Sequence, residues 1–348
     1  MTPLFDLELI VVSGKGGVGR TTVAAALARA AADAGKRVLL AASTTTDRLA
    51  RMFGRSEPVG TQVVTLAPGI DAVNMTSESA LHEYGLLILR SELVTRALFE
   101  NRAVRGFLGA VPGLDAYAIL GKAWWHTTEV AAGRPRYDLV ILDGPASGHA
   151  TLMLRIPGAI LAAMPKGPLA RDARALQDLL HDPARAALLI VTLAEELPAR
   201  ESVELATAAR DTLGLTLGPL VVNALPSEAP TAPPLAALLD RLPTLEIAGT
   251  AAGTMVAAGA ASAATAAAVV GAATGTAGVP PGSDAALWAT LRLAASAGAQ
   301  RRLADTVVAR LRGELGLPIV ALPRLPTVDL GPTAIAELAT YFIPQRTP

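Results

Sequence analysis

A glycine-rich run near the start of the chain combines residue types that bind phosphate. The run is Gly14-Lys15-Gly16-Gly17-Val18-Gly19-Arg20-Thr21-Thr22. Its glycines allow a loop that leaves a strand to turn tightly and to point its amide groups inward. A helix that follows such a loop offers the positive end of its dipole to an anion. The spacing nearly fits the phosphate-loop pattern G-x-x-x-x-G-K-[ST], so the run predicts a nucleotide-phosphate site.

Three side chains in and beyond this run have types suited to phosphate and metal. A cation at Arg20 would meet the outer phosphates, and the Thr21 hydroxyl is placed to ligate Mg²⁺. Asp143 directly follows an apolar run that predicts a strand. An acid at the tip of a strand beside the phosphate loop holds Mg²⁺ through water in P-loop proteins. We therefore expect the metal at Thr21 and Asp143; the alternative for Asp143 is a strand-end acid that caps the next turn.

The same glycines also satisfy a second pattern, the dinucleotide fingerprint G-x-G-x-x-G, through Gly14, Gly16 and Gly19. A dinucleotide site needs an acid about 20 residues further on, at the end of the second strand, to hold the ribose. The second predicted strand ends in Ala41–Thr44 and carries no acid there. The dinucleotide interpretation also leaves the two threonines after the loop without a role. We therefore favour the phosphate loop, and a purely structural glycine turn is the least favoured alternative.

The pattern of the whole chain predicts an α/β fold, a P-loop parallel sheet wrapped by helices and carrying helical insertions. Nearly continuous apolar runs, as expected for strands covered on both faces, predict strands. These runs are Leu9–Val12, Arg37–Ala42, Leu139–Leu142, Leu188–Thr192, Leu220–Asn223 and Ile319–Leu322. Helices are expected at Thr21–Ala34, Pro168–Leu180 and Ala285–Leu315, with a helical insertion at 77–132. We expect one domain over residues 1–348.

Composition narrows the classes of function. Lysine plus arginine and aspartate plus glutamate number 30 each, so no net charge attracts nucleic acid or an anionic membrane. The chain contains no cysteine, which excludes disulfides, thiolate zinc sites and iron–sulfur clusters and fits a cytoplasmic protein. The first residues lack a basic region followed by a long apolar one, so we expect no signal peptide.

An uncharged segment at 247–283 is longer than the ~20 residues that a membrane-spanning helix needs. It is rich in alanine, glycine and threonine, and it nearly lacks the leucine, isoleucine and phenylalanine that favour insertion. A loose alanine-rich helix or a mobile loop is the favoured interpretation, and a partner-binding surface or a membrane span are the alternatives. We therefore expect no integral membrane segment.

The phosphate-loop run resembles the deviant Walker A group of ATPases, which has an extra lysine at the start of the loop, here Lys15. The segment Asp143–His149, with the sequence DGPASGH, is similar to that of the ArsA and tail-anchored-protein-targeting branch. Asn223 resembles the asparagine that contacts adenine there, and Leu322–Pro326 resembles the segment that returns to the base. The resemblance implies a divergent, bacterial-type member that binds ATP and Mg²⁺ and acts as an ATPase.

The same resemblance implies that Lys15 reaches across a dimer interface to the partner's nucleotide. A second cation facing the same phosphates gains attraction only when two subunits close, so nucleotide would set the geometry of the dimer. The alternative for Lys15 is a solvated loop lysine. The implied partners are a second copy or a related ATPase, together with an unknown protein client; nucleic acid is not expected.

Two positions depart from the family pattern. Arg20 replaces the loop lysine; it keeps the charge, but its guanidinium is a broad planar fork. Thr44 stands where the family has an acid that orients the attacking water, and threonine cannot act as a carboxylate base. Asp47 would substitute only if its loop re-folded. With Lys15 and Arg20 as the catalytic candidates we expect slow hydrolysis, and the alternative is a catalytically impaired regulatory subunit that partners an active relative.

Overall fold

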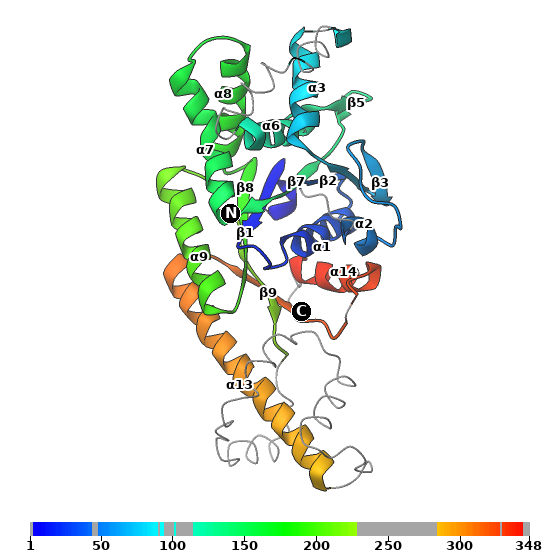
Figure 1. Cartoon of the computed structure of the whole chain (residues 1–348), viewed down its shortest axis with the longest axis vertical. Helices are drawn as coiled ribbons and strands as arrows, with labels where there is room; N and C mark the ends of the chain where they lie inside the picture. Colours follow the sequence, from blue (N-terminus) through cyan, green and yellow to red (C-terminus); the bar gives the residue numbers. More distant parts are fainter. Residues whose placement is uncertain are drawn as a thin grey trace.

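The computed structural model describes most of the chain. The described residues are 3–43, 48–89, 91–93, 101, 114–227, 284–327 and 329–343. Thr44, Asp47 and the uncharged segment 247–283 lie outside these residues, as does part of the predicted insertion. Within the described residues the chain forms an eight-stranded sheet with helices on both faces (Figure 1).

The sheet has the strand order β10-β9-β8-β1-β7-β2-β4-β3. Its strands are β1 Leu9–Gly14, β2 Val38–Ala42, β3 Val64–Ala67, β4 Ile70–Asn74, β7 Leu139–Ala146, β8 Ala186–Leu193, β9 Leu220–Leu225 and β10 Ile319–Pro323. All neighbouring strands are parallel except β3, which pairs antiparallel with β4 at the edge. The α/β fold and all six predicted strands are therefore confirmed, whereas β3 and β4 were not predicted.

The helices account for most of the remaining described residues. They are α1 Arg20–Asp33, α2 Arg48–Met52, α3 Ser77–Leu89, α6 Leu114–Thr128, α7 Ser147–Ala163, α8 Pro168–His181, α9 Glu196–Thr207, α13 Asp284–Leu315 and α14 Pro332–Ala339. The predicted helices α1, α8 and α13 are present within two residues of their expected ends, whereas α7, α9 and α14 were not predicted. The insertion was expected to be helical, but it ends in a short hairpin of β5 Val130–Ala131 and β6 Arg134–Pro135.

The two faces of the sheet are covered by different sets of helices. One core cluster includes α1, α2 and α14, and the other includes α6, α7, α8, α9 and α13. Helix α1 lies between the sheet and α14, so its alanines are buried around most of its surface, not along one stripe. Small side chains on both sides of α1 let the sheet and α14 approach it closely. This packing fixes the axis of the helix that follows the glycine-rich run.

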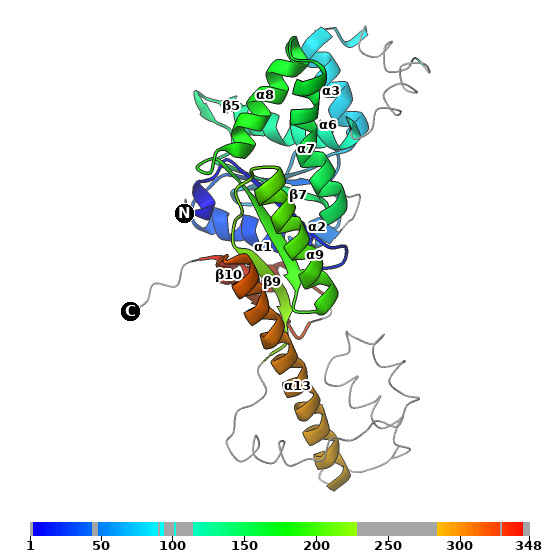
Figure 2. The same ribbon diagram turned by 90° about the vertical axis from the view of Figure 1, so that its left-hand side faces the viewer.

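Several helices extend beyond the two ends of the sheet (Figures 1 and 2). Helices α3 and α6 pack on each other and, together with α7 and α8, form the top of the molecule in Figures 1 and 2. Helix α13 packs its carboxyl-terminal part on α9 and β9, with Leu311 and Leu315 buried, and its other end points away from the sheet (Figure 2). Across the part of the chain that the structure describes, none of the helices combines the length and apolar character of a membrane span.

Candidate functional site

The glycine-rich loop joins β1 to α1 at the centre of the sheet, where β1 lies between β7 and β8. A Cβ at Gly14 would lie 2.1 Å from the carbonyl oxygen of Val191 in β8, so no side chain fits there. Gly19 has φ +88°, and a Cβ there would lie 2.2 Å from the Asn223 amide nitrogen. Both ends of the loop therefore require glycine, for close packing and for a positive φ, which is +154° at Gly14 and +88° at Gly19.

The middle of the loop is open to solvent, while its last part is anchored. Gly16 and Gly17 are exposed, whereas Val18 is buried in the core cluster that contains α1, and Thr22 is buried in the first turn of α1. The N-cap residue of α1 is Gly19, which has no side chain to cap the helix. Its first amide groups are thus available to an acceptor beyond the helix, which is the arrangement that binds anions at helix termini.

The structure brings Thr21 and Asp143 into direct contact. The Thr21 hydroxyl donates to Asp143 Oδ2 over 2.6 Å, and Asp143 pairs in register with Val12 on β1 and Ala42 on β2. The Asp143 side chain is buried, and this burial raises its pKa, while the Thr21 hydrogen bond and the Arg20 charge act in the opposite direction. A buried carboxylate beside a hydroxyl offers the hard oxygen ligands that Mg²⁺ prefers.

Arg20 turns from the first turn of α1 toward the end of β7. Its Nη1 donates to the carbonyl oxygen of Gly144 over 2.9 Å. Burial lowers the pKa of Arg20, and the Asp143 charge raises it. Arginine nevertheless keeps its proton, since its ordinary pKa lies far above neutrality. The guanidinium therefore places a positive charge next to Asp143. Its hydrogen bond also ties α1 to the segment that follows Asp143.

Two serines that the sequence analysis did not single out fix this same segment. The Ser13 hydroxyl donates to the Pro145 carbonyl over 2.9 Å, and the Ser43 hydroxyl donates to the Asp143 carbonyl over 2.8 Å. Each serine is a polar residue at the end of a continuous apolar strand, and this position is the feature of the sequence that could have indicated a role for it. Together with Arg20 they hold three successive carbonyl groups at the end of β7.

Asn223 comes from β9, two strands away from β1, and reaches the loop. Its Nδ2 donates to the Val18 carbonyl over 2.8 Å. The structure thus places Asn223 against the backbone of the glycine loop, while its contact with adenine stays a prediction. This contact also explains why Gly19 has no room for a side chain.

Lys15 is held by a residue of its own chain. Its Nζ lies 2.6 Å from Glu201 Oε1 on α9, and the Ser147 hydroxyl at the start of α7 donates to Glu201 Oε2 over 3.3 Å. The hydrogen bond from Lys15 lowers the pKa of Glu201. Lys15 is therefore paired in this structure and is not a freely solvated loop lysine. Glu201 was not among the predicted site residues, because α9 was not predicted from the sequence.

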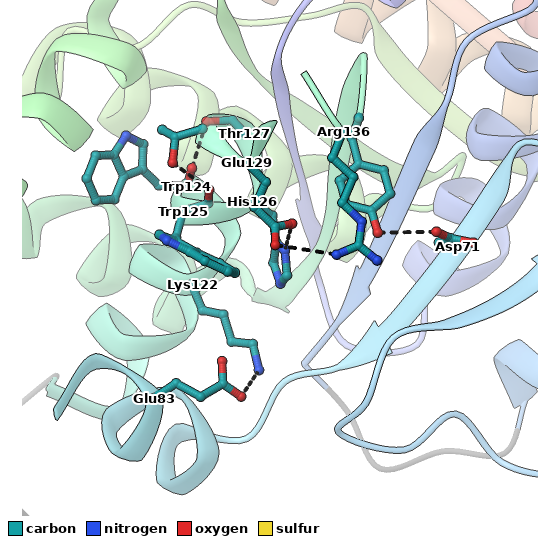
Figure 3. A network of polar contacts seen from close by, with 11 residues as sticks. Asp71, Glu83, Lys122, Trp124, Trp125, His126, Thr127, Glu129 and Arg136 are labelled. Atoms are coloured by element: carbon teal, nitrogen blue, oxygen red, sulfur yellow. Dashed lines mark hydrogen bonds and ion pairs between the residues drawn. The ribbon is translucent and has the colours of Figure 1, made fainter. Parts of the chain in front are cut away.

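A second polar network ties the end of α6 to the sheet (Figure 3). His126 Nδ1 lies 2.7 Å from Glu129 Oε2, and Glu129 Oε1 lies 3.5 Å from Arg136 Nη1. Arg136 lies over the Tyr137 ring, 5.2 Å from its centroid, and the Tyr137 hydroxyl donates to Asp71 Oδ2 on β4 over 3.2 Å. The chain that leaves the insertion is thus fastened to the strand that leads into it.

The histidine of this network is deeply buried. His126 is 3% exposed, and its Nε2 has no hydrogen-bond partner within the described residues. Burial lowers its pKa, and the hydrogen bond to Glu129 opposes this effect. Beside it, Lys122 on α6 pairs with Glu83 on α3 over 2.7 Å. None of these residues belongs to the phosphate loop, so we interpret this cluster as the support of the insertion.

Comparison with known proteins shows which proteins this part of the chain resembles. A sequence profile described as anion-transporting ATPase matches residues 7–167, a range that includes β1 through α7. The match contains both the glycine loop and Asp143. Over residues 7–167 the chain is therefore similar to the ArsA ATPase family.

Individual relatives are similar to this chain at modest identity. ATPase BagA of Mycobacterium tuberculosis is 29% identical over 226 residues, which cover 63% of this chain and 66% of the relative. An arsenical pump-driving ATPase of Escherichia coli is 28% identical over 61% of this chain and 38% of its own length. ATPase GET3 of Kluyveromyces lactis is 26% identical over 45% of this chain and 47% of its own. The match thus spans less than two thirds of each relative.

Proposed function

We propose that this chain binds ATP with Mg²⁺ at the loop between β1 and α1 and hydrolyses it slowly. The observation that carries the proposal is the 2.6 Å contact between Thr21 and Asp143 at the exit of the glycine loop. The backbone amides of the loop and of the first turn of α1 would hold the phosphates. Thr21 would ligate Mg²⁺ directly and Asp143 through water; Mg²⁺ neutralises developing phosphate charge when bound.

The family supports this proposal at a coarse level. The relatives that match this chain are named ATPases. Among the described residues no cluster of three or more His, Asp or Glu forms a ready-made metal cage. A site with one carboxylate and one hydroxyl suits Mg²⁺, which usually keeps several waters and binds substrate phosphates.

We further propose that Arg20 acts as the cation at the outer phosphates and Asn223 lies at the adenine. In this structure Nη1 of Arg20 is engaged with the Gly144 carbonyl, which leaves its other donors for a phosphate oxygen. The planar guanidinium of arginine does not match a pocket that fits the compact ammonium group of the lysine in the family pattern. Slow hydrolysis follows from this fit, because the charge at the transferred phosphate is then less well placed.

The proposed unit of function is a cytoplasmic dimer that changes geometry with nucleotide and acts on a protein client. The partner is a second copy or a related ATPase, and Lys15 supplies the contact with the partner's nucleotide. One domain with a helical insertion would carry out nucleotide binding, dimer formation and client binding. Sedimentation velocity with and without Mg-ATP tests this proposal: a nucleotide-dependent rise in mass supports it, and an unchanged mass at micromolar protein counts against it.

Phosphate release is the experiment that tests the enzymatic part. Purified chain with Mg-ATP should release phosphate above background, and Asp143→Ala should remove that release. The substitution deletes the proposed outer ligand of the metal without touching the loop backbone. No release at micromolar protein would rule the ATPase out.

A second candidate function, a regulatory subunit with little hydrolysis, is favoured by the Arg20–Gly144 hydrogen bond of 2.9 Å. An arginine that donates to a backbone carbonyl of the same chain has fewer donors left for a substrate. This candidate predicts that nucleotide raises thermal stability without being consumed, since a ligand selective for the folded state stabilises it. Restoring the family residues, Arg20→Lys with Thr44→Asp, should then raise phosphate release, and a fast wild-type enzyme would contradict it.

A further inference from the structure

Glu201 connects two parts of the proposed nucleotide site. One of its carboxylate oxygens accepts from Lys15 of the glycine loop over 2.6 Å, and the other accepts from Ser147 over 3.3 Å. Ser147 is the first residue of α7, directly after the segment that Asp143 begins. A single side chain on α9 thus links the start of the loop to the start of α7.

This link is built so that it can open. The side chains of Lys15 and Glu201 are 26% and 31% exposed, so water screens their attraction and replaces either partner at modest cost. A lysine ammonium is a compact charge on a flexible stem with three donors, so it can turn from one anion to another. The ion pair can therefore hold Lys15 in the absence of another anion, but it is too weak to keep Lys15 when a stronger anion is present.

The partner's nucleotide would compete for the same lysine when the proposed dimer closes. Its phosphates bring several negative charges next to the residue that begins the loop, and these charges attract Lys15 and repel the Glu201 carboxylate. Lys15 has one partner among the described residues before nucleotide binds, and that partner is Glu201. Binding therefore includes an exchange of Glu201 for a phosphate oxygen.

We propose that Glu201 is a positioning residue, which holds Lys15 in the nucleotide-free chain and releases it to the phosphates. The release also frees Glu201 to change its contact with Ser147, so the binding of nucleotide in the dimer would alter the start of α7. This inference rests on the proposed nucleotide site. It adds Glu201 as the partner that Lys15 gives up when it contacts a phosphate.

Calorimetric titration of the full chain with Mg-ATP tests the exchange. Glu201→Gln keeps the shape and removes the charge, so nucleotide should bind about two- to fivefold more tightly, the range expected for a partly exposed ion pair. Glu204→Gln is the matched control on the same helix, because Glu204 pairs with Arg200 in solvent and should leave affinity unchanged. Unchanged or weaker binding by Glu201→Gln overturns the proposal, and weaker binding is what a merely structural role predicts.

The same titration in a Lys15→Ala background shows whether Glu201 acts through Lys15. The gain from Glu201→Gln should shrink to less than half in this background, because the competition has been removed. An equal gain in both backgrounds overturns the proposal, since Glu201 would then act on the phosphates by its own charge.

A measurement without nucleotide separates this inference from the proposed function. Acylation of lysines read by mass spectrometry should be at least twofold faster at Lys15 in Glu201→Gln than in the wild type. The exposed Lys166 serves as the internal reference and should not change. An unchanged rate at Lys15 overturns the inference even if the wild type binds nucleotide. A faster rate in a chain that binds no nucleotide instead overturns the proposed function, and the release step with it.

Discussion

The glycine loop and the helical insertion are held in place by different kinds of contact. Around the loop, Ser13, Arg20, Ser43 and Asn223 all donate to backbone carbonyls. Under the insertion, side chains bond to one another in a chain of titratable groups that begins at His126. The first arrangement fixes a backbone and leaves its amide groups for an anion. The second fastens a helical layer to the sheet through side chains that include the buried His126.

This difference has a testable consequence. Changes around the loop should alter nucleotide chemistry, and changes under the insertion should alter stability and leave nucleotide affinity nearly unchanged. A variant of the network that abolished nucleotide binding while the chain stayed folded would break the distinction. The following variants sharpen it, from the largest expected effect to the smallest.

Replacing Thr21 should have the largest effect. Thr21→Ala removes a proposed metal ligand and leaves the buried Asp143 without the 2.6 Å hydrogen bond that stabilises its charge. We expect phosphate release to fall about 100-fold, because metal ions supply several kcal/mol of charge stabilisation. Thr21→Ser is the control, since it keeps the hydroxyl and should retain most of the release. Equal loss in both variants would show that the methyl group, and not the hydroxyl, matters.

Replacing Gly19 should have the next largest effect. Gly19→Ala forces a left-handed backbone on alanine and pushes Asn223 from the Val18 carbonyl. The expected loss of stability is about 1–3 kcal/mol, measured by urea unfolding, with weaker nucleotide binding. Gly16→Ala is the matched control, because a Cβ there meets nothing within 4 Å and should change stability by less than about 0.5 kcal/mol. Similar losses at both positions would contradict the geometry of the loop.

The buried His126 should make stability depend on pH. Burial depresses the pKa of His126 in the folded chain below its unfolded value, so the unfolded chain binds more protons between these two values. Stability should therefore be fully present above about pH 6.5 and should fall as pH drops through the window below it, by about 1.4 kcal/mol per pH unit. His126→Gln should flatten this dependence, measured by urea unfolding at pH 5 to 8.

The matched control for this pH dependence is His149→Gln, because His149 is exposed at the start of α7. It should leave the slope as it is in the wild type. A slope that survives in His126→Gln would assign the pH dependence to another group.

The smallest effect is expected at Tyr137. Tyr137→Phe removes the hydrogen bond to Asp71 of β4 and keeps the ring under Arg136. The expected cost is about 0.5–1.5 kcal/mol in the free energy of unfolding, with Mg-ATP affinity within error of the wild type. A clear loss of affinity would mean that the insertion is coupled to the loop through β4.

The central sheet was predictable from the sequence because its strands are covered on both faces. Short, continuous apolar runs such as Leu139–Leu142, followed by turn residues, are typical of strands that are buried on both faces. The edge strands β3 and β4 were missed for the opposite reason: Val64–Ala67 is mostly part-exposed, and β4 carries Asp71. Helix α7 was missed because Gly148 and Pro157 interrupt its pattern, although the helix contains both.

The candidate site was predictable only where its members follow parallel strands or the loop itself. Asp143 could be placed near Thr21 because the carboxyl ends of neighbouring parallel strands meet at one edge of the sheet. Glu201 could not be placed, since its position depends on how α9 packs over the loop, and no local pattern encodes that packing. The ends of β1 and β2 carried a signal in Ser13 and Ser43, but their carbonyl partners became visible only in three dimensions.

The most direct test of the account is hydrogen–deuterium exchange of the full chain with and without Mg-ATP. If the backbone amides of residues 14–22 enclose the phosphates, peptides that cover them should exchange at least tenfold more slowly with nucleotide. Protection should also appear in peptides that contain Asp143. Exchange that is identical with and without saturating Mg-ATP at residues 14–22 would contradict the phosphate site and every role assigned around it.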